Sequence, residues 1–346
     1  MARTLEVVPK TAWLTVNRAC NFRCRWCNAE GTECIGKDEL DIDTAKRITM
    51  IIKKLGIDRI SIIGGEPTLW RHLLEFNVFC KEISMKTCIV TNAALFGLDS
   101  FWKEYLLSPC DEISISVKGA SSEELKNNTS VQDYKNVING IARAIEYYKT
   151  GINVVLNNLN SGFITEYAVL AKEINAIFLN ISFCSVSISD KATVSDYVIE
   201  PHVIVDIVTK QYPRINQLMD GNVFFEMNIP FCVWLDKFLE ELIKRDQITS
   251  GCHVFKKCGL IFDTNSQLLI CNALYDYPIG TLGNDFFDSK SLLAHVNKPK
   301  IVKYYKELSR KPSVYCDGCK WYDKCGGGCP LNWSIYDPDE IISNYI

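Results

Sequence analysis

Short apolar segments alternate with amphipathic segments through the first two hundred residues of the chain. In residues 44–55, for example, Ile48, Ile52 and Leu55 recur at the spacing of one helix face, and Gly56 ends the segment. The pattern predicts strands at residues 13–17, 59–63, 88–91, 113–118, 153–157 and 177–184. It predicts helices at residues 44–55, 69–83, 100–107, 131–149 and 165–174.

Strands that alternate with helices predict an α/β fold built on a parallel sheet. A closed eight-stranded barrel typically needs about 250 residues, and six repeats are too few for one, so we expect an open, partial (β/α)6 barrel like an incomplete TIM barrel. After Pro201 the pattern changes to one helix (203–212) and then a cysteine-rich stretch with few alternating strands. We therefore predict a barrel domain over residues 1–220 and a smaller α+β domain over 221–346.

Composition and charge narrow the class of protein. The chain is 47% hydrophobic with a net charge of −3, which indicates neither a nucleic-acid nor an anionic-membrane partner. The N-terminus lacks the apolar core of a signal peptide, and no apolar run is long enough to span a bilayer. We therefore expect a cytoplasmic protein with reduced thiols.

Sixteen cysteines are too many for packing alone, so metal or cluster ligation is the better interpretation. Three lie near the start of the chain and seven in its last hundred residues. The other six are expected to be small buried hydrophobic residues: Cys34, Cys80, Cys88, Cys110, Cys184 and Cys232.

The first cysteine group follows the first predicted strand in the stretch CNFRCRWC, with the spacing C-x-x-x-C-x-x-C. The thiolates of Cys20, Cys24 and Cys27 could hold three corners of a [4Fe–4S] cluster and leave the fourth iron open for an amine and a carboxylate. Trp26 precedes the last cysteine. A zinc site is the alternative, but it needs a fourth ligand, for which Cys34 is available.

This motif resembles that of the radical S-adenosylmethionine (SAM) superfamily. The resemblance implies that the cluster passes an electron, supplied by a flavodoxin- or ferredoxin-type donor, to SAM. The sulfonium bond then breaks to give a 5′-deoxyadenosyl radical, which abstracts a hydrogen atom from the substrate.

A second motif, GGEP, ends the second predicted strand, where active sites of parallel barrels form. Gly64 and Gly65 let the backbone approach a ligand, and the Glu66 carboxylate can accept a hydrogen bond from an ammonium group. In the resembling family this motif, which Pro67 completes, holds the amino group of SAM. Alone, GGEP could be an ordinary turn.

Polar residues at later strand ends are further candidates for SAM binding. In ISISVKG, Ser114, Ser116 and Lys118 alternate with apolar residues and should face the barrel interior. The family implies contacts to the ribose and carboxylate of SAM here, although Lys118 departs from its commoner S-x-D-G pattern and could be a solvated lysine. Thr91, Asn92 and Asn157 end neighbouring strands. Cys184, on the polar side of the sixth strand, could donate a hydrogen atom as in peptide epimerases, or merely line the wall.

The tail reads C-x-x-C-x5-C-x3-C from Cys316 and resembles the SPASM domain that follows some radical SAM barrels. The resemblance assigns a first auxiliary [4Fe–4S] cluster to Cys252, Cys258, Cys271 and Cys329, and a second to Cys316, Cys319 and Cys325. No cysteine follows Cys329, so the second cluster lacks a ligand. Asp337, Asp339 or a scattered cysteine could complete it; otherwise the cluster has an open iron or is a smaller one. A zinc ribbon is the alternative.

The leading hypothesis is oxidative modification of a ribosomally made peptide, such as a crosslink or thioether, with auxiliary clusters as electron acceptors. Asn272 stands where sulfatase-maturating members have aspartate, which argues against that branch. The first cysteine comes at position 20, so we expect no leader-recognition domain ahead of it, and a separate protein could bind the leader peptide. The alternatives are dehydrogenation or rearrangement of a small metabolite, peptide epimerisation, and a non-catalytic iron–sulfur or zinc scaffold.

Overall fold

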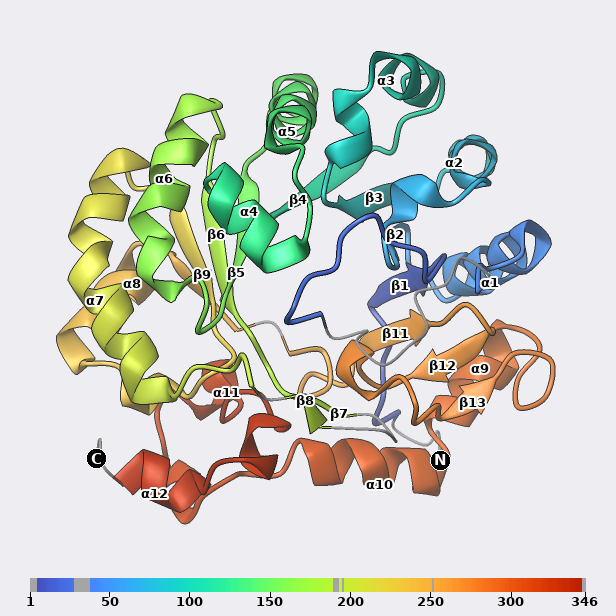
Figure 1. Cartoon of the computed structure of the whole chain (residues 1–346). Coiled ribbons are helices and arrows are strands. Elements are labelled where there is room, and N and C mark those ends of the chain that lie inside the picture. Colours follow the sequence, from blue (N-terminus) through green and yellow to red (C-terminus); the bar gives the residue numbers. More distant parts are fainter. Residues whose placement is uncertain (1–4, 28–37, 189–192, 195, 251, 344–346) are drawn as a thin grey trace.

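The structure is a computed structural model that describes residues 5–27, 38–188, 193–194, 196–250 and 252–343. A curved sheet forms its centre, helices cover the outer face, and the C-terminal segments lie across the open side (Figure 1). The α/β class and the partial barrel predicted from the sequence are confirmed.

All six predicted strands are present and lie side by side in sequence order, each parallel to the next. These strands are rich in apolar residues because helices cover one face of the sheet and the other face lines the barrel interior. The strands are β1 (Thr11–Thr15), β2 (Arg59–Ile63), β3 (Lys86–Thr91), β4 (Glu112–Val117), β5 (Ile152–Leu156) and β6 (Leu179–Phe183).

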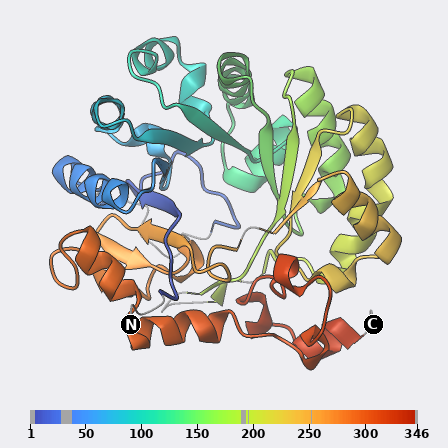
Figure 2. The same cartoon turned by 180° about the vertical axis from the view of Figure 1, so that it is seen from behind.

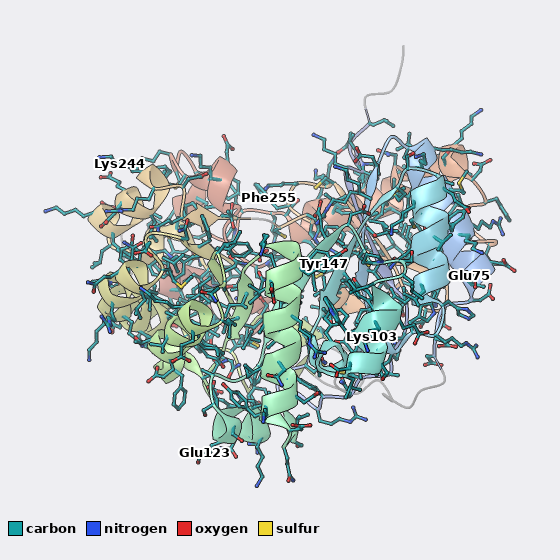
Figure 3. The ribbon with its side chains drawn as sticks, turned by 90° about the horizontal axis from the view of Figure 1, so that it is seen from above. Glu75, Lys103, Glu123, Tyr147, Lys244 and Phe255 are labelled. Carbon is teal, nitrogen blue, oxygen red and sulfur yellow. The ribbon has the colours of Figure 1, made fainter. Side chains whose placement is uncertain are left out.

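The outer layer contains the predicted helices (Figures 1 and 2). Its helices are α1 (Ile42–Lys54), α2 (Leu73–Glu82), α3 (Asp99–Tyr105), α4 (Ser122–Thr129), α5 (Tyr134–Tyr148), α6 (Ile164–Glu173) and α7 (Pro201–Leu218). Of these, α2, α3 and α5 are shorter than predicted, and α7 is longer. Glu75, Lys103 and Tyr147 are exposed on this layer, as Figure 3 shows.

Two helices differ most from the prediction. The helix α4 was not predicted, because its sequence, SEELKNNT, has few apolar residues to show a helical period. The helix α7 runs past the predicted end at residue 212, through Pro213, although proline costs a helix about 3 kcal/mol. Tyr212 and Ile215 are buried on either side of Pro213, so packing holds the helix together there.

The expectation of few strands in the tail is wrong. The strand β9 (Val223–Glu226) pairs with β6, and β10 (Ile248–Thr249) pairs with β9. At the other edge β11 (Gly259–Phe262) pairs with β1 in parallel and leads into an antiparallel hairpin of β12 (Gln267–Leu269) and β13 (Gly280–Thr281). The C-terminal part therefore shares one sheet with the barrel, and a domain boundary at residue 220 stays a prediction.

The remaining helices are α8 (Asp236–Lys244), α9 (Ser289–Val296), α10 (Pro299–Leu308), α11 (Tyr322–Cys325) and α12 (Pro338–Ser343). Of these, α10, α11 and α12 lie along the open side of the barrel (Figure 1), and α11 ends at Cys325. Among the helices of the described ranges, none is long and apolar enough to cross a membrane.

Candidate active site

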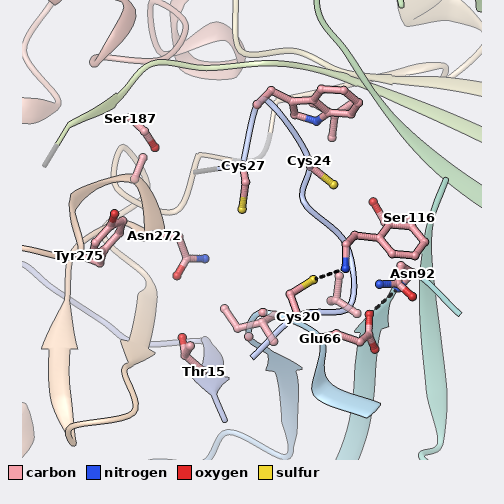
Figure 4. Close-up of a pocket in the computed structure, with 18 of the residues that line it drawn as sticks. Thr15, Cys20, Cys24, Cys27, Glu66, Asn92, Ser116, Ser187, Asn272 and Tyr275 are labelled. Atoms are coloured by element: carbon pink, nitrogen blue, oxygen red, sulfur yellow. Dashed lines mark hydrogen bonds between the residues drawn. The ribbon is translucent and has the colours of Figure 1, made fainter. Parts of the chain in front are cut away.

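The first cysteine group lies on a loop at the carboxyl ends of the barrel strands. Cys20, Cys24 and Cys27 all line a cavity of about 420 Å³, and Figure 4 shows their side chains around it. The amides of Arg23 and Arg25 donate hydrogen bonds to carbonyls of α4, which fixes the loop against the barrel rim. Three thiols are therefore held on one wall of a cavity of ligand-binding size.

The thiols of this loop are close enough to influence one another. Burial is the main cause that raises the pKa of Cys20 to about 12; the neighbouring Glu66, Cys24 and Cys27 add to the shift, and a hydrogen bond from the Phe22 amide opposes it. A metal that binds Cys20 as a thiolate must therefore offset the cost of its burial.

The described residues include no group of three histidine, cysteine, aspartate or glutamate side chains that converges on one metal ion. A polynuclear cluster makes a different demand, because each cysteine binds a separate iron and the ligands surround a volume. The three thiols fit that demand. The zinc alternative relied on Cys34, which lies outside the described residues.

The GGEP turn packs against the chain that leads into the cysteine loop. The amides of Gly65 and Glu66 donate hydrogen bonds to the carbonyls of Asn17 and Ala19. A Cβ atom on Gly64 would lie 2.4 Å from Asn17 Oδ1, and one on Gly65 2.3 Å from the Ala19 carbonyl. The glycines thus make room for this chain segment, in addition to any room that they leave for a ligand.

The Glu66 carboxylate is buried and accepts four hydrogen bonds. Oε1 accepts from the Thr68 amide, the Thr68 hydroxyl and the Thr91 hydroxyl at 3.1, 2.7 and 2.6 Å, and Oε2 accepts from the Asn92 amide at 2.8 Å. Burial raises the pKa of Glu66, and these hydrogen bonds oppose the shift. Oε2 accepts from one donor among the described residues, so it retains capacity for an ammonium group.

The Asn92 side chain joins this network to the cysteine loop, because its Nδ2 donates to Asn21 Oδ1 at 2.8 Å. Strand β2, strand β3 and the loop are thereby locked together around one carboxylate. Thr91 and Asn92 also line the cavity.

Lys118 supplies a cation to the cavity. Its Nζ donates to Ser116 Oγ at 2.6 Å and lies 6.0 Å from the centroid of the Trp26 ring. Its charge lowers the pKa of Cys24 and of Cys184, although burial raises both pKa values overall. The arrangement suits a carboxylate ligand next to the cysteine loop.

Some predicted residues line the cavity and others do not. Cys184 and Ser116 are in its wall, whereas Ser114, Asn157 and Pro67 are not. Asn157 Oδ1 accepts from the Leu159 amide and so closes its own turn, and Ser114 Oγ accepts from Asn153 Nδ2. Contact of these two polar side chains with SAM is therefore not supported by their positions.

The sequence analysis missed a charged pair in the same cavity. The Arg18 guanidinium lies 2.5 Å from Asp263 Oδ2, both side chains are buried, and Arg18 also stacks over the Tyr275 ring at 5.0 Å. Asp263 Oδ1 has no hydrogen-bond partner among the described residues. The two residues lie 245 positions apart, so the sequence pattern gave no sign that they form a pair.

The four cysteines assigned to a first auxiliary cluster come together behind the cavity wall. Cys271 interacts electrostatically with Cys329 and Cys252, and Cys258 with Cys252. Cys271 directly precedes Asn272, which lines the cavity, and Cys329 receives a hydrogen bond from the lining residue Ser185.

The three cysteines assigned to a second auxiliary cluster are also neighbours. Burial raises the pKa of Cys316 and of Cys325, and Cys316 interacts electrostatically with each of Cys319 and Cys325. The glycine run at residues 326–328 joins Cys325 of this set to Cys329 of the first set.

The N-terminal part of the chain is similar to a known protein family. Residues 14–162 match the family model of the radical SAM superfamily. Sequence relatives include the probable GTP 3',8-cyclases of Thermococcus kodakarensis (28% identity over 166 residues, 47% of this chain and 53% of the relative) and Thermoplasma volcanium (30% over 174 residues, 49% and 52%). The chain therefore spans about half the length of these curated relatives.

Two solved structures resemble nearly the whole chain, including its cysteine-rich C-terminal part. Streptococcus suis SuiB bound to its precursor peptide SuiA has a TM-score of 0.71 at 19% identity, over 96% of this chain and 75% of SuiB. The structure of anSMEcpe with bound AdoMet has a TM-score of 0.68 at 17% identity, over 97% of each chain. At these identities the likeness shows a shared fold.

Proposed function

We propose that this chain, whose residues 14–162 match the radical SAM superfamily, abstracts a hydrogen atom from a peptide and modifies that peptide oxidatively. When bound, a [4Fe–4S] cluster and SAM supply the 5′-deoxyadenosyl radical. Cys20, Cys24 and Cys27 would hold the cluster, since all three lie on one loop and line one cavity.

Residues of strands β2, β3 and β4 would hold SAM. Glu66 Oε2 offers an acceptor for the SAM ammonium group, and Lys118 offers a cation for its carboxylate. Trp26 is buried beside Lys118 and offers an apolar surface. The opposite charges of Glu66 and Lys118 match the ammonium and carboxylate groups of an amino acid.

The position of the first auxiliary set carries the oxidative part of the proposal. Cys271 and Cys329 are each linked to a residue of the cavity wall, through Asn272 and Ser185. A cluster held there would sit next to the substrate space and could take up the electron that an oxidation releases. A reaction that merely rearranged its substrate would not need such an acceptor.

An oxidation also releases a proton, and Asp263 is placed to accept it. Its carboxylate lines the cavity, Arg18 fixes Oδ2, and Oδ1 is left without a protein donor among the described residues. Asn272, the residue after the hairpin cysteine, cannot serve as a carboxylate base. We therefore assign the base role to Asp263 Oδ1.

The substrate class rests on the part of the chain outside the barrel. The likeness to GTP 3',8-cyclases covers about half of the chain, whereas the folds of SuiB with a precursor peptide and anSMEcpe with a Kp18Cys peptide cover 96% and 97%. A peptide is therefore favoured over a nucleotide, and a small metabolite remains the alternative.

Anaerobic reconstitution with iron, sulfide, SAM and a reductant tests the proposal. The reconstituted protein is incubated with either a short peptide encoded beside its own gene or GTP, and the Cys24→Ala variant serves as the negative control. We expect 5′-deoxyadenosine to increase with the peptide, and the peptide to lose a pair of hydrogen atoms. GTP-dependent turnover without peptide turnover would overturn the peptide assignment.

Peptide epimerisation is a second candidate, favoured by the position of Cys184 in the cavity wall. Burial raises the pKa of Cys184 to about 11, so it keeps the S–H bond that hydrogen-atom donation requires. This reaction leaves the peptide mass unchanged, and in deuterated water it installs deuterium at the modified carbon. The mass readout therefore separates it from the oxidation.

A further inference from the structure

Cys232 lies beside the three cysteines of the second auxiliary set. Its thiol is near enough to interact electrostatically with Cys325, Cys316 and Cys319. The sequence placed Cys232 among the scattered cysteines, because 84 residues separate it from Cys316. In the folded chain it completes a group of four thiols.

Backbone contacts place Cys232 there independently of its charge. Cys232 is the middle residue of the short 3-10 helix Phe231–Val233, and the Phe231 amide donates to Cys325 Sγ at 3.2 Å. The Cys329 amide donates to the Asn228 carbonyl at 2.7 Å just upstream. The segment before Cys232 is therefore bonded to both ends of the glycine run.

The helix α12 adds a third restraint, because it packs against both Phe231–Val233 and the 3-10 turn Val314–Cys316. A Cβ atom on Gly328 would lie 2.9 Å from the Asn228 carbonyl and 3.1 Å from the Pro230 nitrogen. Gly328 and the segment 228–230 thus approach as closely as their backbones allow. The segment 228–233, which carries Cys232, is thus held next to the C-terminal turns that carry the other three cysteines.

We propose that Cys232 is the fourth ligand of the second auxiliary cluster, with Cys316, Cys319 and Cys325 as the other three. Four cysteines are the ligand set of a complete [4Fe–4S] cluster. The candidate Asp337 is less suited, because it is exposed and its Oδ1 accepts from the Asp339 amide at 2.8 Å, at the start of α12. The proposed fourth ligand thus precedes the first auxiliary set in the sequence.

This inference rests on the proposed function, since it assumes that the tail binds iron–sulfur clusters. Its test therefore uses iron and sulfide content and Mössbauer spectra, which do not depend on turnover. Reconstituted wild-type protein should hold about twelve irons per chain, and Cys232→Ala about eight, or about eleven with a three-iron spectrum. Cys319→Ala should lose iron to the same extent, and Cys80→Ala, which removes a buried thiol of α2, should lose none.

The SAM cluster and the thermal unfolding of the barrel distinguish the loss of one ligand from misfolding of the variant. Cys232→Ala should keep the SAM cluster, shown by SAM-dependent spectral change, and the wild-type thermal unfolding of the barrel. Cys232→Asp, which offers an oxygen ligand, should restore iron with a shifted Mössbauer spectrum. The inference is overturned if Cys232→Ala keeps the wild-type iron content and spectrum, or if wild-type protein holds about eight irons or fewer. Neither result bears on SAM cleavage, so failure of the inference is distinct from failure of the proposed function.

Discussion

Arg18 and Asp263 form a buried ion pair across the mouth of the barrel, with Arg18 Nη2 2.5 Å from Asp263 Oδ2. Arg18 follows β1 by three positions, and Asp263 directly follows β11, the strand that pairs with β1. The parallel pairing of these two strands brings the residues to the same end of the sheet. The pair thereby joins the cysteine loop to the wall that carries the first auxiliary set.

The Asp263→Asn substitution should uncouple SAM cleavage from product formation. The amide can still accept from Arg18 but cannot take a proton, so product per 5′-deoxyadenosine should fall about a hundredfold. This ratio is measured by chromatography and does not depend on how much protein folds, which matters because disrupting a buried pair costs about 3–5 kcal/mol. Asp276→Asn, at an exposed position, is the matched control. An unchanged ratio in Asp263→Asn would exclude it as the base.

The Glu66→Gln substitution should weaken SAM binding. The new amide nitrogen replaces either Oε1, which accepts from Thr68 and Thr91, or Oε2, which accepts from the Asn92 amide, so a donor faces a donor. We expect SAM affinity to fall about ten- to a hundredfold, from a charge-assisted hydrogen bond of about 1.5–3 kcal/mol. Equilibrium SAM binding and the cluster absorbance measure the two effects separately. The exposed Glu75→Gln is the control, and equal SAM affinity in both variants would contradict the role of Glu66.

The barrel was predictable because each of its strands is a short apolar run followed by a helical period. Strands β9 and β11 were not, since four-residue buried runs such as GLIF show no alternation that separates them from other apolar segments. In both cases the sheet edge to which they add is visible only after the barrel has formed.

The candidate site divides along the same line. Cys20, Cys24 and Cys27 were predictable because they are close in sequence, and Glu66 because it ends a strand. The roles of Asp263 and Cys232 were not, because each meets its partners through contacts between distant segments. The pattern of one sequence reports the spacing of residues that are close in the chain, whereas these contacts join segments that are far apart in it.

Alkylation of Cys184 should depend steeply on pH. Burial raises its pKa to about 11, so the thiol is neutral at pH 7 and the reactive thiolate increases about tenfold per pH unit until the pH nears that value. Because Lys118 lowers this pKa, Lys118→Met should slow the reaction further at pH 9. Iodoacetamide labelling of SAM-free, cluster-loaded protein, followed by peptide mass mapping, measures both rates. Rapid labelling at pH 7 would show a thiolate and argue against hydrogen-atom donation.

The Gly327→Ala substitution should destabilise the C-terminal cysteine sets. Gly326, Gly327 and Gly328 all have left-handed backbones, with φ of 63°, 78° and 79°. An alanine at 327 costs about 1–2 kcal/mol for this conformation, and its Cβ would lie 2.6 Å from Pro312 Cδ. Gly283→Ala is the matched control, since Gly283 has a φ of 90° and open space around it.

Gly327→Ala should therefore lower the unfolding temperature more than Gly283→Ala does, by several degrees at about 2–4 °C per kcal/mol for chains somewhat shorter than this one. It should also reduce the iron content, because the glycine run sets the distance between Cys325 and Cys329, which belong to different cysteine sets. Thermal unfolding and iron quantitation on the reconstituted protein measure the two effects. If both variants unfold at the same temperature with full iron, the glycine run does not position the two sets.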